Sequence, residues 1–377
     1  MNIVIMGTAH PFRGGLAAFN ERLAKQFISE GHNVEIYNFS LQYPSILFPG
    51  KTQYTDEPAP DNLTIKQKVN SVNPINWIKV GKELCRMAPD ILIVKFWLPF
   101  MGPAFGTICR QIRKNRKTKI ICIADNIIPH EHRPGDKIFT KYFSKAVDAW
   151  IGMSKEVYDD VLKVVKSPKR ALIPHPVFDN YGQVISRQEA LKRLNLDPAN
   201  RYILFFGFIR GYKGLDLLFK AMAQPELAKH NEIKLIVAGE FYGDSQPYYK
   251  LIDDLKIADR VELRTDYIPN EAINSYFCAS DLIVQPYKTA TQSGVTQIGY
   301  HFGKPMLVTN VGGLPEIIGH KVSGYVVEPN EKEIAQAIAD FYDNDRYEAY
   351  AAATLLRKKE FEWSNLSGKI IELASEK

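Results

Sequence analysis

The 377-residue chain has little cysteine and no long run of apolar residues. Its four cysteines are scattered without a Cys-x-x-Cys pair, which favours a reducing compartment and argues against a structural zinc site. No stretch of about 18 consecutive apolar residues occurs, so we expect no membrane-spanning helix. Residues 1–7 lack the basic segment and apolar core of a signal peptide and resemble a first strand. We therefore expect a cytoplasmic globular protein of two or three domains.

Positive charge is concentrated in the first half of the chain. Residues 1–175 contain 25 Lys and Arg against 15 Asp and Glu, whereas the remainder has 23 against 27. The densest basic run, residues 110–119, fits a solvated helix C-terminus. It also fits peripheral contact with the inner face of an anionic membrane, where each cation contributes about 1 kcal/mol. Nucleic acid is not an expected partner, because the run lacks interleaved aromatic residues and no binding module accompanies it.

Short apolar runs alternate with amphipathic segments throughout, which predicts parallel sheets covered by helices on both faces. The predicted strands are residues 2–6, 34–39, 91–96, 119–124, 148–152 and 170–173, and then 202–206, 234–238, 261–265, 282–285, 306–308 and 325–327. Among the predicted helices, Ser154 is expected to cap one that runs to about residue 165. Residues 41–75 are rich in proline and break the pattern, so we predict a long loop there.

The predicted fold class is therefore α/β, with two Rossmann-like, doubly wound parallel-sheet domains facing a central cleft. We place the first domain at residues 1–175 and the second at 176–360, joined by a stiff proline-containing segment, residues 173–178.

An apolar strand in the second half leads into a loop that holds Arg210 and Lys213 between Gly207 and Gly214. A helix follows, and the dipole at a helix N-terminus disfavours cations. This placement suggests that an anion such as a phosphate completes the site. The alternative is a pair of surface cations beside a helix.

Three further strand-to-helix turns could bind a ligand. Gly14 and Gly15 could bring backbone N–H groups close to an anion, although Gly-x-Gly-x-x-Gly is absent and a simple tight turn is the alternative. Ser293 precedes free N–H donors at Gly294–Thr296, and could equally be an ordinary N-cap. Glu316 opens a helix after a Gly-Gly turn, where it could bind a ligand or simply complement the helix dipole.

Polar residues also follow the predicted strand 119–124. Asp125, Asn126 and His130 lie where ligands bind in open α/β sheets, and they could contact a sugar hydroxyl or an acceptor, or form a polar loop network. His130 and His132 cannot share one helix face, so a metal site is not expected.

These motifs together resemble the retaining glycosyltransferases of group 1 (family 4), which have the GT-B fold. The resemblance spans nearly the whole chain, is most specific in residues 203–328, and is carried by Gly14-Gly15, Gly207-x-x-Arg210-x-x-Lys213-Gly214, Ala238-Gly239-Glu240, Ser293-Gly294, Gly303-Lys304-Pro305 and Gly312-Gly313-Leu314-Pro315-Glu316.

The resemblance implies a metal-independent enzyme that needs no cofactor. It would transfer a sugar from a UDP- or GDP-sugar, held by the second domain, to a carbohydrate or lipid-linked acceptor on the first, in polysaccharide or glycoconjugate synthesis. Residues 361–377 would form a helix that crosses back to the first domain.

The resemblance also implies roles for individual residues. Arg210 and Lys213 would grip the diphosphate and stabilise its developing charge, and Asp125, Asn126 or His130 would fall near the polar residue that contacts the transferred sugar. The Gly14 and Gly15 amides would reach the same diphosphate from across the cleft. The full set of implied donor-binding residues is Gly14, Gly15, Gly207, Arg210, Lys213, Gly239, Glu240, Ser293, Gly294, Val295, Thr296, Gln297 and Glu316.

The chain departs from the family pattern at one place. Most members carry two glutamates eight positions apart, and alignment on Gly303-Lys304-Pro305 puts Ala290 and Ile298 there. Gln297 or another residue would then hold the ribose. Two alternatives follow from this departure, a non-catalytic nucleotide-sugar-binding protein and a nucleotide-sugar epimerase on the same fold.

Overall fold

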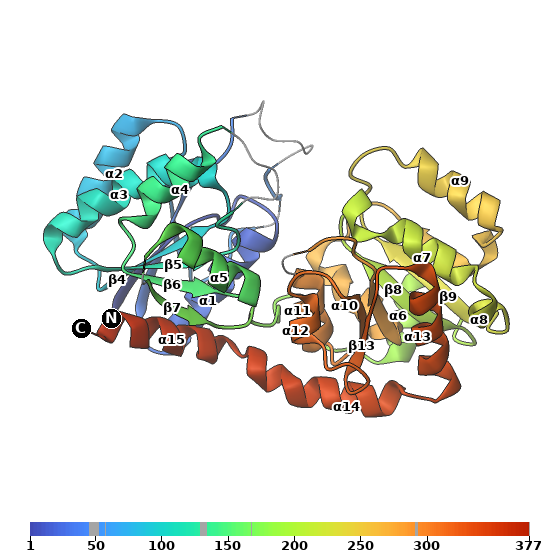
Figure 1. Ribbon diagram of the computed structural model, residues 1–377. Coiled ribbons are helices and arrows are strands. Elements are labelled where there is room, and N and C mark those ends of the chain that lie inside the picture. The colour runs from blue at the N-terminus through green and yellow to red at the C-terminus, as the bar shows by residue number, and fades with distance from the viewer. Residues whose placement is uncertain (45–52, 57, 129–133, 167, 291–292, 377) are drawn as a thin grey trace. The chain divides into compact units, whose positions relative to one another are not determined.

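The computed structural model describes residues 1–44, 53–56, 58–128, 134–166, 168–290 and 293–376. The chain forms two compact units: unit 1 comprises Met1–His175 and Glu362–Lys377, and unit 2 comprises Pro176–Phe361 (Figure 1). Each unit contains its own parallel sheet. The predicted pair of parallel-sheet α/β domains is therefore confirmed.

The sheet of unit 1 has seven strands in the order β3-β2-β1-β4-β5-β6-β7. Its strands are β1 (Asn2–Met6), β2 (Asn33–Leu41), β3 (Thr64–Asn70), β4 (Ile91–Phe96), β5 (Lys119–Ala124), β6 (Ala149–Gly152) and β7 (Lys169–Leu172). The central strands are almost wholly apolar because both faces of a parallel sheet are covered. The strand order reverses between β1 and β4, which makes the carboxyl ends of these two strands the expected ligand position in this unit.

Helices cover both faces of this sheet. They are α1 (Gly15–Ser29), α2 (Pro74–Met87), α3 (Gly102–Ile112), α4 (Asp136–Ser144), α5 (Lys155–Val164) and α15 (Trp363–Ser375). Helices α2, α3 and α4 form one packed layer, and α1 and α15 pack together on the opposite face (Figure 1). The predicted cap of α5 is confirmed, because the Ser154 hydroxyl accepts a hydrogen bond from the Val157 N–H at 3.3 Å.

The prediction of a long loop over residues 41–75 is wrong in part. Thr64–Asn70 form β3, an edge strand that pairs in parallel with β2. Its lysines carry ion pairs instead of packing into the core, Lys66 with Glu35 at 2.7 Å and Lys68 with Glu83 at 3.1 Å. Because an edge strand can remain polar, it lacks the apolar run that identified the other strands.

Unit 2 repeats the architecture with six strands in the order β10-β9-β8-β11-β12-β13. Its strands are β8 (Arg201–Phe206), β9 (Ile233–Ala238), β10 (Val261–Arg264), β11 (Leu282–Gln285), β12 (Met306–Thr309) and β13 (Gly324–Val327). Its helices are α6 (Arg187–Leu194), α7 (Leu215–Met222), α8 (Pro225–Ala228), α9 (Gln246–Leu255), α10 (Asn270–Ala279), α11 (Gly294–His301), α12 (Leu314–Ile317), α13 (Glu331–Asp343) and α14 (Tyr347–Arg357). Each of the six strands predicted for this half of the chain is present, and the order reverses between β8 and β11.

Helix α15 returns the chain to unit 1. Trp363 is buried, and its ring centroid lies 5.1 Å from that of Phe19 on α1. The Ser367 hydroxyl donates a hydrogen bond to Glu30 at 2.6 Å. Within the described ranges, no helix is both long and apolar enough to span a bilayer.

Candidate anion site of unit 2

The candidate site of unit 2 begins where β8 and β9 end. Gly207 has a φ of +92°, and its N–H donates to the Ala238 carbonyl at 2.9 Å. Gly239 has a φ of +135°, and a Cβ there would stand 2.5 Å from the Gly207 carbonyl oxygen. A side chain at residue 239 would therefore clash with backbone, which explains why the Gly239 position of the motif takes glycine.

Arg210 precedes a single 3-10 turn, Gly211–Lys213, which ends with Lys213 and leads into α7. The Arg210 guanidinium lies 4.0 Å from the ring centroid of Tyr242, and the Lys213 ammonium lies 5.6 Å from that of Tyr287. In the described part of the chain neither cation has a carboxylate partner, whereas the nearby Lys288 pairs with Asp216 at 2.8 Å. Arg210 and Lys213 are thus held by aromatic rings and keep their charge available for an anion.

The Lys213 ammonium sits close to the backbone of the glycine loop. Its Nζ is 3.1 Å from the point where a Cβ on Gly207 would stand. Burial, reinforced by the positive charge of Arg210, lowers the pKa of Lys213 to about 8. A bound anion would restore the solvation that this ammonium has lost.

The N-terminus of α11 lies beside this loop. Val295 Cγ2 is 3.8 Å from the same Cβ position on Gly207. The Ser293 hydroxyl does not cap the helix but lies 3.4 Å from the Tyr287 hydroxyl, and the first turn contains no acidic residue. The first N–H groups of α11, from Gly294 to Thr296, therefore lack a side-chain acceptor among the described residues.

Two predicted donor-binding side chains point into the protein. The Thr296 hydroxyl donates to the Gln285 side chain at 3.2 Å, and the residue is fully buried. Gln297 is fully buried, and neither of its amide atoms has a partner within the described residues. A ribose contact by Gln297 stays a prediction.

The two predicted glutamates follow the carboxyl ends of two strands, β9 and β12, that are separated in the sheet by β8 and β11. Glu240 is partly exposed after β9, and its carbonyl accepts the Ile209 N–H at 2.8 Å, which ties the Arg210 loop to β9. Glu316 is exposed in the first turn of α12, which follows β12. The structure therefore brings Gly207, Gly239, Arg210, Lys213 and the start of α11 together and places Glu316 one strand beyond β11.

Candidate ligand site of unit 1

The glycine turn of unit 1 is open to solvent. Gly14 has a φ of +103° and precedes α1, which begins at Gly15 and has neither a capping side chain nor an acidic residue in its first turn. A Cβ on either glycine would meet nothing within 4 Å. Gly14 is therefore required by its backbone conformation, whereas nothing within the described protein excludes a side chain at Gly15.

Side chains from neighbouring elements fix the loop that leads to these glycines. Asn38 on β2 donates to the carbonyls of Ala9 at 2.7 Å and His10 at 2.8 Å. Asn20 on α1 donates to the Thr8 carbonyl at 2.8 Å. Three side-chain hydrogen bonds therefore hold the carbonyls of this loop in place.

Asp125 follows β5 and is bound to a buried lysine that is not among the predicted site residues. Lys95 on β4 donates to Asp125 Oδ1 at 2.7 Å, and its ammonium lies 3.6 Å from the ring centroid of Phe19. Burial lowers the pKa of Lys95, and Asp125 opposes that shift. The sequence contains one indication of this ion pair, because Lys95 is a charged residue in an otherwise apolar strand, Ile91–Phe96. His130 lies outside the described residues.

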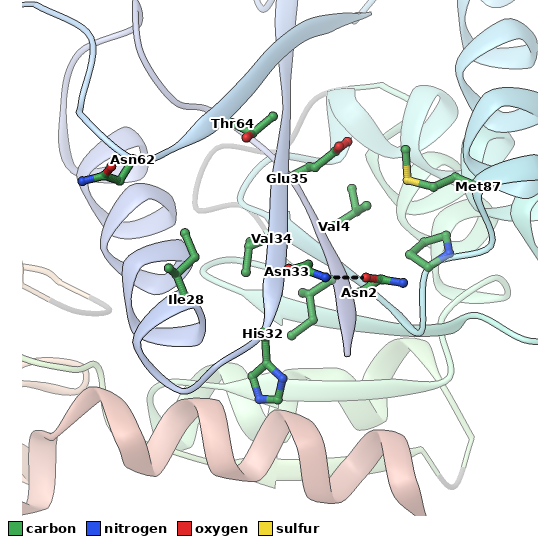
Figure 2. A pocket seen from close by; sticks show the side chains of 12 residues that line it. Asn2, Val4, Ile28, His32, Asn33, Val34, Glu35, Asn62, Thr64 and Met87 are labelled. Atoms are coloured by element: carbon green, nitrogen blue, oxygen red, sulfur yellow. Dashed lines mark hydrogen bonds between the residues drawn. The ribbon is translucent and has the colours of Figure 1, made fainter.

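A hollow of about 420 Å³ lies elsewhere in unit 1 (Figure 2). It is lined by residues at the amino ends of β1 and β2, including Asn2, His32 and Asn33, and by Met87 at the end of α2. None of the predicted site residues lines it, because they lie at the carboxyl ends of the strands. Within the described ranges, no three His, Cys, Asp or Glu side chains are grouped so as to hold a metal ion.

Comparisons identify the family. Residues 186–354 match the family described as Glycosyl transferases group 1. The D-inositol 3-phosphate glycosyltransferase of Thermobifida fusca is 30% identical over 349 residues, which cover 84% of this chain and 78% of that protein. The chain therefore belongs to the group 1 glycosyltransferase family, as its motifs indicated.

Solved structures confirm the GT-B fold. The structure of Anabaena Alr3699/HepE in complex with UDP aligns with a TM-score of 0.73 at 16% identity, over 100% of both chains. Sequence similarity is often partial, as with the D-inositol 3-phosphate glycosyltransferase of Thermobispora bispora, which is 27% identical over 219 residues, 55% of this chain and 51% of that one. The chain thus spans about half the length of the first curated relatives that it matches.

Proposed function

We propose that the protein is a retaining glycosyltransferase that uses a UDP- or GDP-sugar and a carbohydrate or lipid-linked acceptor in polysaccharide or glycoconjugate synthesis. The observation that carries the proposal is the pair of cations without carboxylate partners in the described chain, Arg210 and Lys213, beside the uncapped start of α11. The solved complexes of the Anabaena protein with UDP and UDP-glucose support a nucleotide-sugar donor.

The proposed chemistry needs positive charge at one place. The bond between the anomeric carbon and the diphosphate breaks, the diphosphate leaves with the bonding electrons, and the acceptor oxygen takes its place while its proton is released. Arg210, Lys213 and the α11 amides would stabilise the charge that grows on the leaving group, and removal of one such donor typically costs about 3–4 kcal/mol. The leaving group departs as an anion, so a protonated carboxylic acid of the glycosidase type is not required. We propose that these groups act without a metal ion or other cofactor.

Charge reversal tests the donor site. We expect the double variant Arg210→Glu/Lys213→Glu to lose both the thermal shift caused by nucleotides and sugar transfer. A native protein at 100 times the Kd of its ligand gains about 2.7 kcal/mol, so screening UDP, GDP, ADP and CMP identifies the base. Lys192→Glu/Lys250→Glu is the charge-matched control, since both lysines are exposed on α6 and α9. Unchanged turnover by the Arg210/Lys213 double variant refutes the proposal.

Because the two usual glutamates are absent, two alternatives to a sugar transferase also need to be tested. Ile298 is apolar and buried in α11, so its side chain cannot bind a ribose hydroxyl as a glutamate carboxylate would. Tight donor binding without transfer or hydrolysis across a broad acceptor panel would favour a non-catalytic binding protein. Isomerisation of the donor sugar without any acceptor would favour an epimerase.

We also propose that unit 1 contacts an anionic membrane, although not through the basic run. Two cations of that run are paired within the protein, Arg113 with Asp148 and Lys117 with Asp90, both at 3.1 Å. Exposed apolar and basic side chains instead share the outer faces of α2 and α4. This basic–apolar face comprises Ile75, Ile78, Lys79 and Lys82 on α2, Ile138, Lys141 and Tyr142 on α4, and Lys145 directly after α4.

Vesicle binding tests this membrane proposal. We expect the protein to sediment with phosphatidylglycerol vesicles but not with phosphatidylcholine vesicles, because lysines are attracted to anionic lipid. Ile138→Glu should weaken that binding, whereas Leu356→Glu in unit 2 should not, although both side chains are 71% exposed. Equal loss in the two variants, or no binding by the native protein, contradicts the assignment.

A further inference from the structure

The ion pair between Lys95 and Asp125 lies near the carboxyl ends of β4 and β5, two central strands of the unit 1 sheet. The Lys95 side chain is 2% exposed and that of Asp125 is 21% exposed. Every other residue of β4 is apolar and buried. Replacing a buried ion pair by apolar side chains is often neutral or stabilising, so stability alone gives no reason for a lysine here.

Strand register places this pair at the expected ligand edge. Phe96 of β4 lies beside Ala124 of β5, and the Asp125 N–H continues the ladder to the Phe96 carbonyl at 2.8 Å. Strand β4 also pairs with β1, at the point where the strand order reverses. The Asp125 carboxylate therefore lies at the carboxyl end of the sheet, where Lys95 of the neighbouring strand β4 binds it.

The same lysine packs under the glycine-bearing loop. A Cβ on Gly7 would stand 3.2 Å from Lys95 Cβ and 2.6 Å from Asn20 Nδ2. Asn20 in turn holds the loop through the Thr8 carbonyl. Lys95 is thus one part of a packed base that supports both the loop and Asp125.

Only one oxygen of the carboxylate is used inside the protein. Lys95 binds Oδ1, and within the described residues no donor reaches Oδ2. A carboxylate fixed through one oxygen can accept a hydrogen bond at the other in a set direction.

We propose that Lys95 is a positioning residue. It fixes Asp125 so that Oδ2 of the carboxylate accepts a hydrogen bond from a hydroxyl of a bound sugar. This inference rests on the proposed transferase function. It differs from a merely structural role in one respect, because the Lys95 ammonium then affects turnover only through Asp125.

Kinetics of four variants test the proposal. Lys95→Met removes the donor to Asp125, and we expect a fall in kcat of up to about 10²-fold, as for a small misplacement of a catalytic contact, with a smaller change in the KM for donor. Lys95→Gln retains an N–H donor and should recover part of the lost kcat. The double variant Lys95→Met/Asp125→Asn should be no slower than Asp125→Asn alone.

A second buried lysine provides the control. Lys304 in unit 2 contacts the Tyr347 hydroxyl at 3.1 Å and is also buried. Lys304→Met should lower Tm without the selective loss of kcat. If Lys95→Met does not fold, Asp125→Glu, which displaces the carboxylate from Lys95, should show the same loss of kcat.

Three outcomes would overturn the inference. They are multiplicative losses of kcat in the double variant, a fall in Tm without any kinetic change in Lys95→Met, and wild-type kcat in Asp125→Glu. The proposed function fails separately, when the native protein turns over no nucleotide sugar, with sugar transfer or release of the nucleoside diphosphate as the readout.

Discussion

Lys213 and Lys95 show two ways in which a folded chain can retain a desolvated ammonium group. Lys95 has a carboxylate at 2.7 Å and an aromatic ring at 3.6 Å, so its charge is balanced within unit 1. Lys213 has an aromatic ring and the cation Arg210 nearby, so its charge is opposed. The second arrangement favours an anionic ligand, and the first favours a fixed carboxylate.

The pKa of Lys213 gives a pH dependence with a definite sign. Below about pH 8 the ammonium is charged and attracts a diphosphate; above that pH it is neutral and the attraction is lost. We expect nucleoside diphosphate binding to weaken as pH rises through about 8, with proton uptake on binding in that range. Isothermal titration calorimetry in two buffers measures both effects. Lys213→Arg should abolish the pH dependence, because guanidinium stays charged, and a pH-independent Kd in the native protein would contradict the prediction.

Tyr242 should contribute to donor binding through Arg210. Its ring lies 4.0 Å from the guanidinium, and such a contact contributes about 0.5–2 kcal/mol. Tyr242→Leu should therefore raise the nucleotide Kd by roughly 2- to 30-fold, since 1.4 kcal/mol corresponds to tenfold. Tyr242→Phe, which keeps the ring, should bind like the native protein, and equal Kd values for the two variants would show that the ring is not needed.

At the scale of elements, sequence patterns located the strands and the loops that end them. Apolar runs identified the central strands, and glycine with charged residues identified the Arg210 loop before any contact was known. The partners of those residues could not be found in the same way. Lys95 and Asp125 are 30 residues apart and meet only because β4 and β5 are neighbours in register. The edge strand β3 was missed because solvent and ion pairs replace the apolar neighbours that make a strand recognisable.

The turn before α1 allows stability and binding to be separated. Gly14→Ala should destabilise unit 1 by about 1 kcal/mol or more, because a φ of +103° is strained for alanine. Gly15→Ala should leave the free energy of unfolding unchanged or slightly higher, since its Cβ meets no atom within 4 Å. If the Gly15 amide contacts a ligand anion, the same variant should still weaken nucleotide binding. Urea unfolding and calorimetry measure the two effects, and native affinity in Gly15→Ala would show that no bound anion lies against the added methyl group.

At the scale of the whole molecule, unit 1 is built from two distant pieces of chain. Helix α15 covers the same face of the sheet as α1, and its buried tryptophan packs against Phe19. The Arg22 guanidinium lies 5.2 Å from the ring centroid of Trp363, which adds a cation–π contact between α1 and α15. The core of unit 1 is therefore complete only when the last helix is in place.

Trp363→Ala should accordingly cost about 3–5 kcal/mol in the free energy of unfolding of unit 1, as expected for a buried tryptophan. Trp363→Phe should cost less because a ring remains against Phe19. Leu162→Ala, at a side chain 50% exposed on α5, is the surface control and should cost little. Urea denaturation followed by a unit 1 probe measures all three, and equal losses for Trp363→Ala and Leu162→Ala would contradict the role of α15.

The chain enters and leaves unit 2 side by side, since the Val177 N–H donates to the Phe361 carbonyl at 2.9 Å. In the sequence, unit 2 is therefore an insertion between the two segments of unit 1, and its own ends lie next to each other. A very short linker would join the two segments of unit 1. Deleting the codons of unit 2 and joining the flanking codons would yield unit 1 with α15 attached, and the deleted codons expressed separately would yield unit 2. Each half of the enzyme can then be titrated with nucleotide by itself, and new termini for circular permutation belong at this junction.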